Sequence, residues 1–202
     1  MDQRLDQQFG FLAELDKLKD VLRQSLVAAT HRNENSAEHS WHLAMMALVL
    51  SEHLPSSPPI NLLRVLKMVL IHDIIEIDAG DSFLYDATAN ATKVARETAA
   101  AERIFSLLPS DQTAEFRQLW DEFEAGVTAE AKWAQGLDRL QAVLQNIHTG
   151  GASWRRHHIA KSQILERNRK IGETMPEIWA AIVNRLDQIE AQGIFHYPNQ
   201  ES

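Results

Sequence analysis

Apolar residues recur at intervals of three and four along most of this 202-residue chain. Such spacing is typical of amphipathic α-helices, because it places the apolar side chains on one face. Leu5, Phe9, Leu12 and the leucines at 15, 18 and 22 predict a first helix over about 2–24. No segment shows the strict alternation of a half-buried strand. The sequence therefore predicts an all-α fold, a helical bundle of seven or more helices.

Breakers divide the rest of the chain into further helices. Asn35, followed three residues later by Glu38, has the pattern of a helix-capping box. The stretch LPSSPP and the glycines at 126, 150 and 151 mark interruptions. We expect helices after residue 35 to about 53, and over about 61–77, 89–108, 111–124, 128–147, 159–171 and 175–192. No linker is long enough to split the chain, which predicts one domain over 1–202.

Composition excludes several classes of protein. The formal net charge of −8 leaves no basic footprint for polymeric nucleic acid or for an anionic membrane. The absence of cysteine excludes disulfides, thiolate zinc sites and thiol catalysis. The polar start MDQRLDQQFG does not resemble a signal peptide, and no apolar run approaches the roughly 18 residues of a membrane span. A soluble cytoplasmic protein is the expectation.

The stretch LIHDIIEIDAGD places ionisable residues at the end of a strongly apolar helix. Glu76 follows His72 by four residues and Asp73 by three, so a continuous helix puts all three on one flank. The opposite flank, including Val69 and Ile74, is aliphatic. Moving ionised carboxylates out of water costs several kcal/mol each without compensation, about the cost of a core mutation. We therefore expect a positively charged partner at this flank.

A metal ion is the partner that the remaining sequence favours. His39 and His42 lie one turn apart at the start of the second helix. Asp138 lies in AKWAQGLDRLQAVL, beside apolar positions of its helix. Imidazoles and carboxylates from three helices form a mixed nitrogen and oxygen donor set. This set suits Mn²⁺, Co²⁺, Fe²⁺, Zn²⁺ or Ni²⁺ better than Ca²⁺, with Mg²⁺ also open.

The order His39, His72-Asp73, Asp138 resembles the HD-domain phosphohydrolase superfamily. The stretches RNENSAEHSWHLAMMAL, LKMVLIHDIIEIDAGD and EFEAGVTAEAKWAQGLDRLQ are similar to the corresponding motifs of the bacterial 5′-deoxynucleotidase group. The similarity spans about 15–170, which leaves a C-terminal helix and tail over about 171–202. It implies a fold of the HD-domain type and a homodimer.

The resemblance also implies roles for individual residues. The metal ligands it implies are His39, His72, Asp73 and Asp138. Glu76 matches the acid that handles the proton of the attacking water, and Asp81 matches an acid near the sugar hydroxyl. Arg23 matches a phosphate-binding arginine if one residue is gapped between it and His39. The group has a tryptophan after that arginine, where this chain has Gln24.

These observations predict a metal-dependent phosphoric monoester hydrolase. Its substrate would be a nucleoside 5′-monophosphate, ribo or deoxyribo, attacked by a metal-activated water. Arg32, in the loop before His39, has the bidentate geometry that suits phosphate, or it pairs with Glu34, Glu38 or a ligand carboxylate. Two alternatives stay open at this point. One is a phosphodiesterase or pyrophosphohydrolase for another small phosphorylated metabolite, and the other is a non-catalytic sensor of nucleotide and metal.

Overall fold

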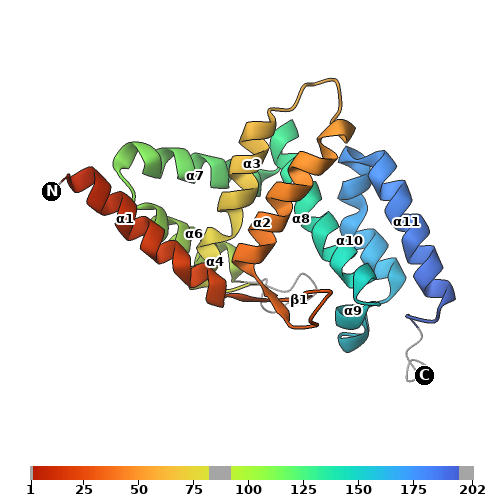
Figure 1. Ribbon diagram of the computed structural model, residues 1–202. Helices are drawn as coiled ribbons and strands as arrows, with labels where there is room; N and C mark the ends of the chain where they lie inside the picture. Colours follow the sequence, from red (N-terminus) through yellow and green to blue (C-terminus); the bar gives the residue numbers. More distant parts are fainter. Residues whose placement is uncertain (1, 82–91, 196–202) are drawn as a thin grey trace.

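Helices dominate the computed structural model of the chain, which describes residues 2–81 and 92–195 (Figure 1). The α-helices are α1 (Gln3–Leu15), α2 (Ser36–Val49), α3 (Leu62–Ile71), α4 (Glu76–Ala79), α6 (Lys93–Phe105), α7 (Ser110–Ala125), α8 (Ala129–His148), α9 (Ala152–Arg156), α10 (Lys161–Thr174) and α11 (Pro176–Ala191). The expected all-α fold with seven or more helices is confirmed. Within the described ranges, no helix has the length and apolar character needed to cross a bilayer.

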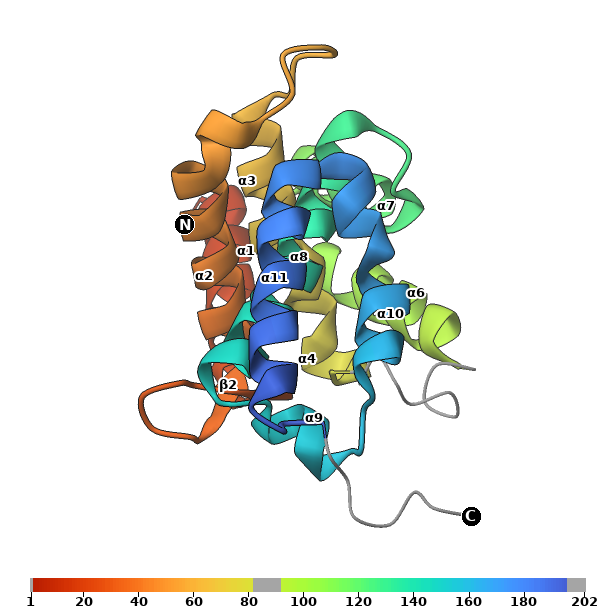
Figure 2. The ribbon, with the colours of Figure 1, turned by 90° about the vertical axis from the view of Figure 1, so that its right-hand side faces the viewer.

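Helix α3 occupies the centre and packs against α2, α7 and α8. Its residues Val65, Met68 and Val69 are fully buried. On α8, Trp133 and Leu137 are likewise fully buried, as their helical spacing predicts. Helices α10 and α11 pack against α8 and against each other, and Figure 2 shows both in front of it. The core therefore lies between α2, α3 and α8; predicted ligands lie on α2, on α8 and just after the end of α3.

The predicted capping box at the start of α2 is confirmed. The Asn35 side chain accepts a hydrogen bond of 2.9 Å from the backbone N–H of Glu38. The Glu38 carboxylate accepts one of 3.2 Å from the backbone N–H of Asn35. These two bonds pair backbone donors that a helix start otherwise leaves unpaired. They fix where α2 begins, and so fix His39 at the end of its first turn.

The prediction of a helix to residue 24, with no strand after it, is wrong. Helix α1 ends at Leu15, a 3₁₀ segment η1 (Asp16–Asp20) follows, and β1 (Leu22–Leu26) then pairs antiparallel with β2 (Asn33–Asn35). Local periodicity does not reveal this pairing, because each strand is stabilised by the other rather than by its own neighbours. The consequence for the site is direct: Arg23 is on a strand beside the N-terminus of α2.

The expected continuous helix over 61–77 is also wrong in its last turns. Helix α3 ends at Ile71, and a 3₁₀ segment η3 (His72–Ile75) precedes α4. The Nδ1 atom of His72 bonds the carbonyl oxygen of Val69 at 3.0 Å. A continued α-helix would pair that carbonyl with the N–H of Asp73, so the ring competes with the helix. Gly80, with φ of 74°, ends α4 as expected for a C-terminal glycine.

The apolar side of the first helix is exposed to solvent. Phe9 is 62% exposed on α1 and Trp41 is 64% exposed on α2. Both helices lie on the side nearest the viewer in Figure 1, which becomes the left edge in Figure 2. We define the α1–α2 apolar face by its exposed residues Leu5, Phe9, Leu12, Trp41, Met45 and Leu48. Its residues follow helical spacing on both helices, so it is a continuous stripe on each.

Candidate metal site

Three of the four predicted ligands converge from three separate elements. One ligand atom from each of His39 on α2, His72 on η3 and Asp138 on α8 lies within 4.8 Å of the other two. His39 and His72 are buried, whereas the Asp138 side chain is 32% exposed. The cluster is therefore closed toward the core and open to solvent on the Asp138 side.

The His72 ring presents a lone pair to this cluster. Its Nδ1 atom donates to the Val69 carbonyl, so the neutral ring carries its hydrogen there and Nε2 has none. Nε2 is buried without a hydrogen-bond partner among the described residues. It nevertheless lies 3.0 Å from Oδ1 of Asp73. When Asp73 is ionised, two groups that only accept hydrogen bonds thus face each other at contact distance.

The His39 ring is arranged in the same way. Its Nδ1 atom lies 3.1 Å from Oε1 of Gln141, an amide oxygen that can accept the ring hydrogen. Nε2 then has a lone pair, 3.0 Å from Oδ1 of Asp138 and 3.7 Å from Oδ2 of Asp73. Burial, together with the positive charge of Arg23, lowers the pKa of His39 to about 3. The ring is therefore neutral near pH 7, the form that ligates metals.

These donors fit a divalent transition-metal ion. Once both aspartates are ionised, two imidazole lone pairs and the carboxylates of Asp73 and Asp138 meet without a hydrogen between them, which is unfavourable unless a cation or a proton lies among them. The Nε2 atom of His72 is the observation that decides the fit, because it has no hydrogen-bond partner among the described residues. Two nitrogens and up to two carboxylates suit the transition metals expected from the sequence.

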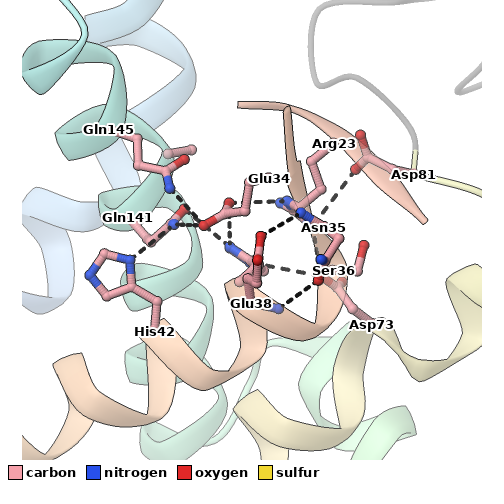
Figure 3. Close-up of polar contacts among 12 residues, drawn as sticks. Arg23, Glu34, Asn35, Ser36, Glu38, His42, Asp73, Asp81, Gln141 and Gln145 are labelled. Atoms are coloured by element: carbon pink, nitrogen blue, oxygen red, sulfur yellow. Dashed lines mark hydrogen bonds and ion pairs between the residues drawn. The ribbon is translucent and has the colours of Figure 1, made fainter. Parts of the chain in front are cut away.

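Arg23 provides positive charge next to the cluster (Figure 3). Its Nη1 atom donates to Oδ2 of Asp73 at 2.6 Å. Four more carboxylates lie between 3.7 and 4.0 Å from its guanidinium: those of Asp81, Glu76, Asp138 and Glu34. One guanidinium cannot neutralise five carboxylates. The excess of negative charge is a second, independent reason why the site favours a bound cation.

Glu76 lies one turn beyond His72 and points to the same region. Its Oε2 atom accepts a hydrogen bond of 2.6 Å from the hydroxyl of Ser36, at the start of α2. Burial, reinforced by the neighbouring Asp73, raises the pKa of Glu76 well above its usual value. Burial likewise raises the pKa of Asp73 to about 8. A carboxyl group with a raised pKa can hold or release a proton near neutral pH.

The structure places the other predicted residues differently. Asp81 follows α4 and lies at the edge of the cluster, with Oδ1 3.7 Å from Nη1 of Arg23. Arg32 is half exposed and outside the cluster, where its guanidinium bonds both carboxylate oxygens of Glu38 at 2.9 and 2.6 Å. Of the two arginines considered for phosphate, Arg23 is thus beside the cluster and Arg32 is not.

Three residues near the site were not singled out from the sequence. They are Glu34, Ser36 and Gln141, all buried. Ser36 holds Glu76, and Gln141 holds His39. Gln141 follows Asp138 by three residues, so helical spacing could have placed it on the same face. No sequence pattern indicated that Glu34 is buried, because it lies in a polar stretch. Its burial results from the pairing of β1 with β2.

Comparisons with known proteins identify the family of the chain. A model of the HD domain family matches residues 15–179. A crystal structure of a predicted metal-dependent phosphohydrolase from Magnetospirillum magnetotacticum is 42% identical, covers 97% of both chains and has a TM-score of 0.91. An HD-domain phosphohydrolase structure from Listeria innocua, 14% identical, covers 93% of this chain and 92% of its own, with a TM-score of 0.65. The latter supports the fold alone.

Among curated proteins, human 5′-deoxynucleotidase HDDC2 is 33% identical over 136 residues. The bovine protein of the same name is 34% identical over 137 residues. Each alignment covers 67% of this chain and 64% of the relative, so the chain matches a little under two thirds of these relatives' length.

Proposed function

The chain belongs to the HD domain family, and from that premise we propose that it is a metal-dependent phosphohydrolase acting on nucleoside 5′-monophosphates. The observation that supports this most is the pair of histidine lone pairs that face two aspartates in a buried cluster. The name of the human relative, a 5′-deoxynucleotidase, supports a nucleotide monoester as the substrate.

The ligand set proposed for one divalent ion is His39, His72, Asp73 and Asp138. Asp73 is included because its two oxygens lie next to Nε2 of both histidines. When bound, such an ion lowers the pKa of water and neutralises charge on a phosphoryl oxygen. The donor set does not select among Mn²⁺, Co²⁺, Fe²⁺, Zn²⁺ and Ni²⁺.

Glu76 is proposed as the proton-handling residue. Ser36 fixes one of its oxygens, and its raised pKa allows the other to carry a proton near pH 7. In ester hydrolysis, water adds to phosphorus and the bond to the sugar 5′-oxygen breaks. Glu76 can take the proton lost by that water, or give one to the leaving oxygen, without holding the metal. This role argues against a sensor, which needs no such group.

Arg23 and Asp81 are proposed to contact the substrate. A phosphate next to Asp73 would lie within reach of the Arg23 guanidinium, which forms strong bidentate bonds to such groups. Asp81 lies near the same Nη1 atom, at 3.7 Å, and can accept hydrogen bonds from sugar hydroxyls. Arg32 receives no role here, since Glu38 occupies its guanidinium.

A homodimer through the α1–α2 apolar face is also proposed. Isolated exposed apolar side chains are ordinary, but a face of six large residues on two helices is typical of an interaction surface. A second copy of the chain offers the same face, and two-fold dimers use identical patches.

Phosphate release tests the proposal. Chelator-treated protein is supplied with Mn²⁺ and assayed on nucleoside 5′-monophosphates, phosphodiesters and pyrophosphates. We expect release from the monophosphates and none from the Asp138→Asn variant. Turnover of diesters or pyrophosphates alone would favour the enzyme alternatives. Nucleotide binding without turnover of any substrate would favour the sensor.

A further inference from the structure

Glu34 is a buried carboxylate for which the proposed reaction has no use. It lies on β2, is 2% exposed, and faces α8 across the bundle. Its Oε1 atom accepts hydrogen bonds from the side-chain amides of Gln141 at 2.8 Å and Gln145 at 2.6 Å. Figure 3 shows both glutamines reaching from α8 toward it. Such a buried charge is costly, which calls for an explanation of what it holds in place.

The hydrogen bonds of Gln141 fix which way its amide points. Its Nε2 atom faces Oε1 of Glu34 at 2.8 Å and Nδ1 of His42 at 3.3 Å. An ionised carboxylate only accepts hydrogen bonds, so the nitrogen end of the amide must face Glu34. The oxygen end must then face His39, where Oε1 lies 3.1 Å from Nδ1.

The orientation of that amide fixes the His39 ring in turn. The amide oxygen only accepts, and so does the Asp138 carboxylate 3.0 Å from Nε2, so the two compete for the single hydrogen of the neutral ring, and the fixed oxygen of Gln141 favours its place on Nδ1. The neutral ring then has its lone pair on Nε2, the atom directed at Asp138 and Asp73. A reversed amide would put a donor against Nδ1, move the hydrogen to Nε2 and remove the lone pair from the cluster.

We propose that Glu34 and Gln141 are positioning residues that hold His39 in its metal-ligating tautomer. Glu34 orients the Gln141 amide, and Gln141 orients the imidazole. The inference rests on the proposed function in one respect, namely that Nε2 of His39 binds a metal ion. The arrangement of hydrogens on the ring is a property of the metal-free chain, so it can be measured separately.

The chain offers a matched control in Gln145. This residue is also a buried glutamine on α8 and also donates to Oε1 of Glu34, but no contact joins it to His39 among the described residues. Loss of such an outer partner typically weakens metal binding by about 10–100-fold. We expect that loss for Gln141→Ala, measured by competition of Mn²⁺ with a chelator, and near wild-type affinity for Gln145→Ala.

Exchange of the two side chains provides a rescue test. Gln141→Glu alone places two carboxylates together and should weaken binding at least as much as Gln141→Ala. Adding Glu34→Gln restores the hydrogen bond between the two side chains with its direction reversed, because the amide at 34 now donates to the carboxylate at 141. That carboxylate can still accept a hydrogen bond from Nδ1 of His39. The double variant should therefore recover most of the lost affinity, which a merely space-filling role of Gln141 would not give.

The ring nitrogens of His39 can be followed by NMR in metal-free protein. We expect hydrogen on Nδ1 in wild type and in Gln145→Ala, and a loss of that preference in Gln141→Ala. Equal effects of Gln141→Ala and Gln145→Ala, or an unchanged tautomer and affinity in Gln141→Ala, would overturn the proposal. If the tautomer responds as expected while wild type binds no metal, the positioning of His39 by Glu34 and Gln141 is supported and the proposed function fails.

Discussion

Nε2 of His72 lies 3.0 Å from Oδ1 of Asp73, and once Asp73 is ionised neither atom carries a hydrogen to share. Backbone geometry enforces this contact, because the Val69 carbonyl occupies the other ring nitrogen and the two residues are adjacent in η3. The contact stores an unfavourable interaction that a cation between the two groups would relieve.

Metal should stabilise the protein by mass action. An ion that binds only the folded chain adds roughly 2.7 kcal/mol at a free concentration 100 times its Kd. The melting temperature of chelator-treated protein should therefore rise with added Mn²⁺, and continue to rise with its concentration. A melting temperature that is the same with chelator and with excess Mn²⁺ would mean that protein and water satisfy the cluster.

Asp138→Asn should have opposite effects on metal-free and metal-loaded protein. The asparagine amide can donate a hydrogen to Nε2 of His39, which replaces a contact between two acceptors by a hydrogen bond. We expect about 1 kcal/mol of added stability without metal, or roughly 2–4 °C in melting temperature. The same variant should lose most of the stabilisation by Mn²⁺. A less stable metal-free variant would contradict the assigned ring tautomer.

Removal of Arg23 should destabilise the metal-free protein strongly. Arg23→Ala leaves five carboxylates without their nearby cation, and breaking a buried pair typically costs about 3–5 kcal/mol. Denaturant unfolding with chelator present measures this loss. Arg32→Ala is the matched control on the same hairpin, because its exposed pair with Glu38 should contribute at most about 1 kcal/mol. Similar losses in the two variants would contradict the account of the site's charge.

Glu76→Gln should separate proton handling from metal binding. The variant can keep the hydrogen bond to Ser36 but cannot exchange a proton, so turnover should fall by roughly 10²-fold or more. Metal content, measured on the same preparation, should stay at the wild-type level. Loss of metal together with turnover would instead make Glu76 a ligand or the support of one.

Gln24 should weaken discrimination between ribo- and deoxyribonucleotides. The bacterial 5′-deoxynucleotidase group that this sequence resembles has a tryptophan at this place, next to the arginine matched by Arg23. We expect a smaller kcat/KM preference for deoxyribonucleotides in wild type than in Gln24→Trp. A strong deoxyribonucleotide preference in wild type would show that another residue selects the sugar.

The α1–α2 apolar face should hold two copies of the chain together. A charge within this face, as in Trp41→Glu, should convert a dimer to a monomer in light scattering. Val127→Glu is the control, since Val127 is 70% exposed but outside this face. A wild-type monomer, or a dimer unaffected by Trp41→Glu, would remove the basis for this interface.

The sequence predicts local structure better than structure formed by distant contacts. Helical spacing located α8 and the capping box located the start of α2, because both depend on near neighbours. The strand that carries Arg23 was missed, since its pairing with residues 33–35 is not local. The single-domain organisation and the cytoplasmic location stay predictions.

The site shows the same division. His39, His72 and Asp138 were named from the sequence and do converge. Glu34 was not named, because its burial follows from the hairpin rather than from any pattern of its own. The excess of acids around Arg23 could not be anticipated either, since it depends on how four elements meet.

Metal titration tests the central claim most directly. Chelator-treated wild type, His72→Ala and His53→Ala are each titrated with Mn²⁺ by calorimetry. His53 is the control, because it lies at the end of a 3₁₀ segment, η2 (Leu50–His53), with a partly exposed side chain. The account predicts one ion per chain for wild type and His53→Ala, and loss of that binding in His72→Ala. Equal binding by His72→Ala, or none by wild type, would contradict it.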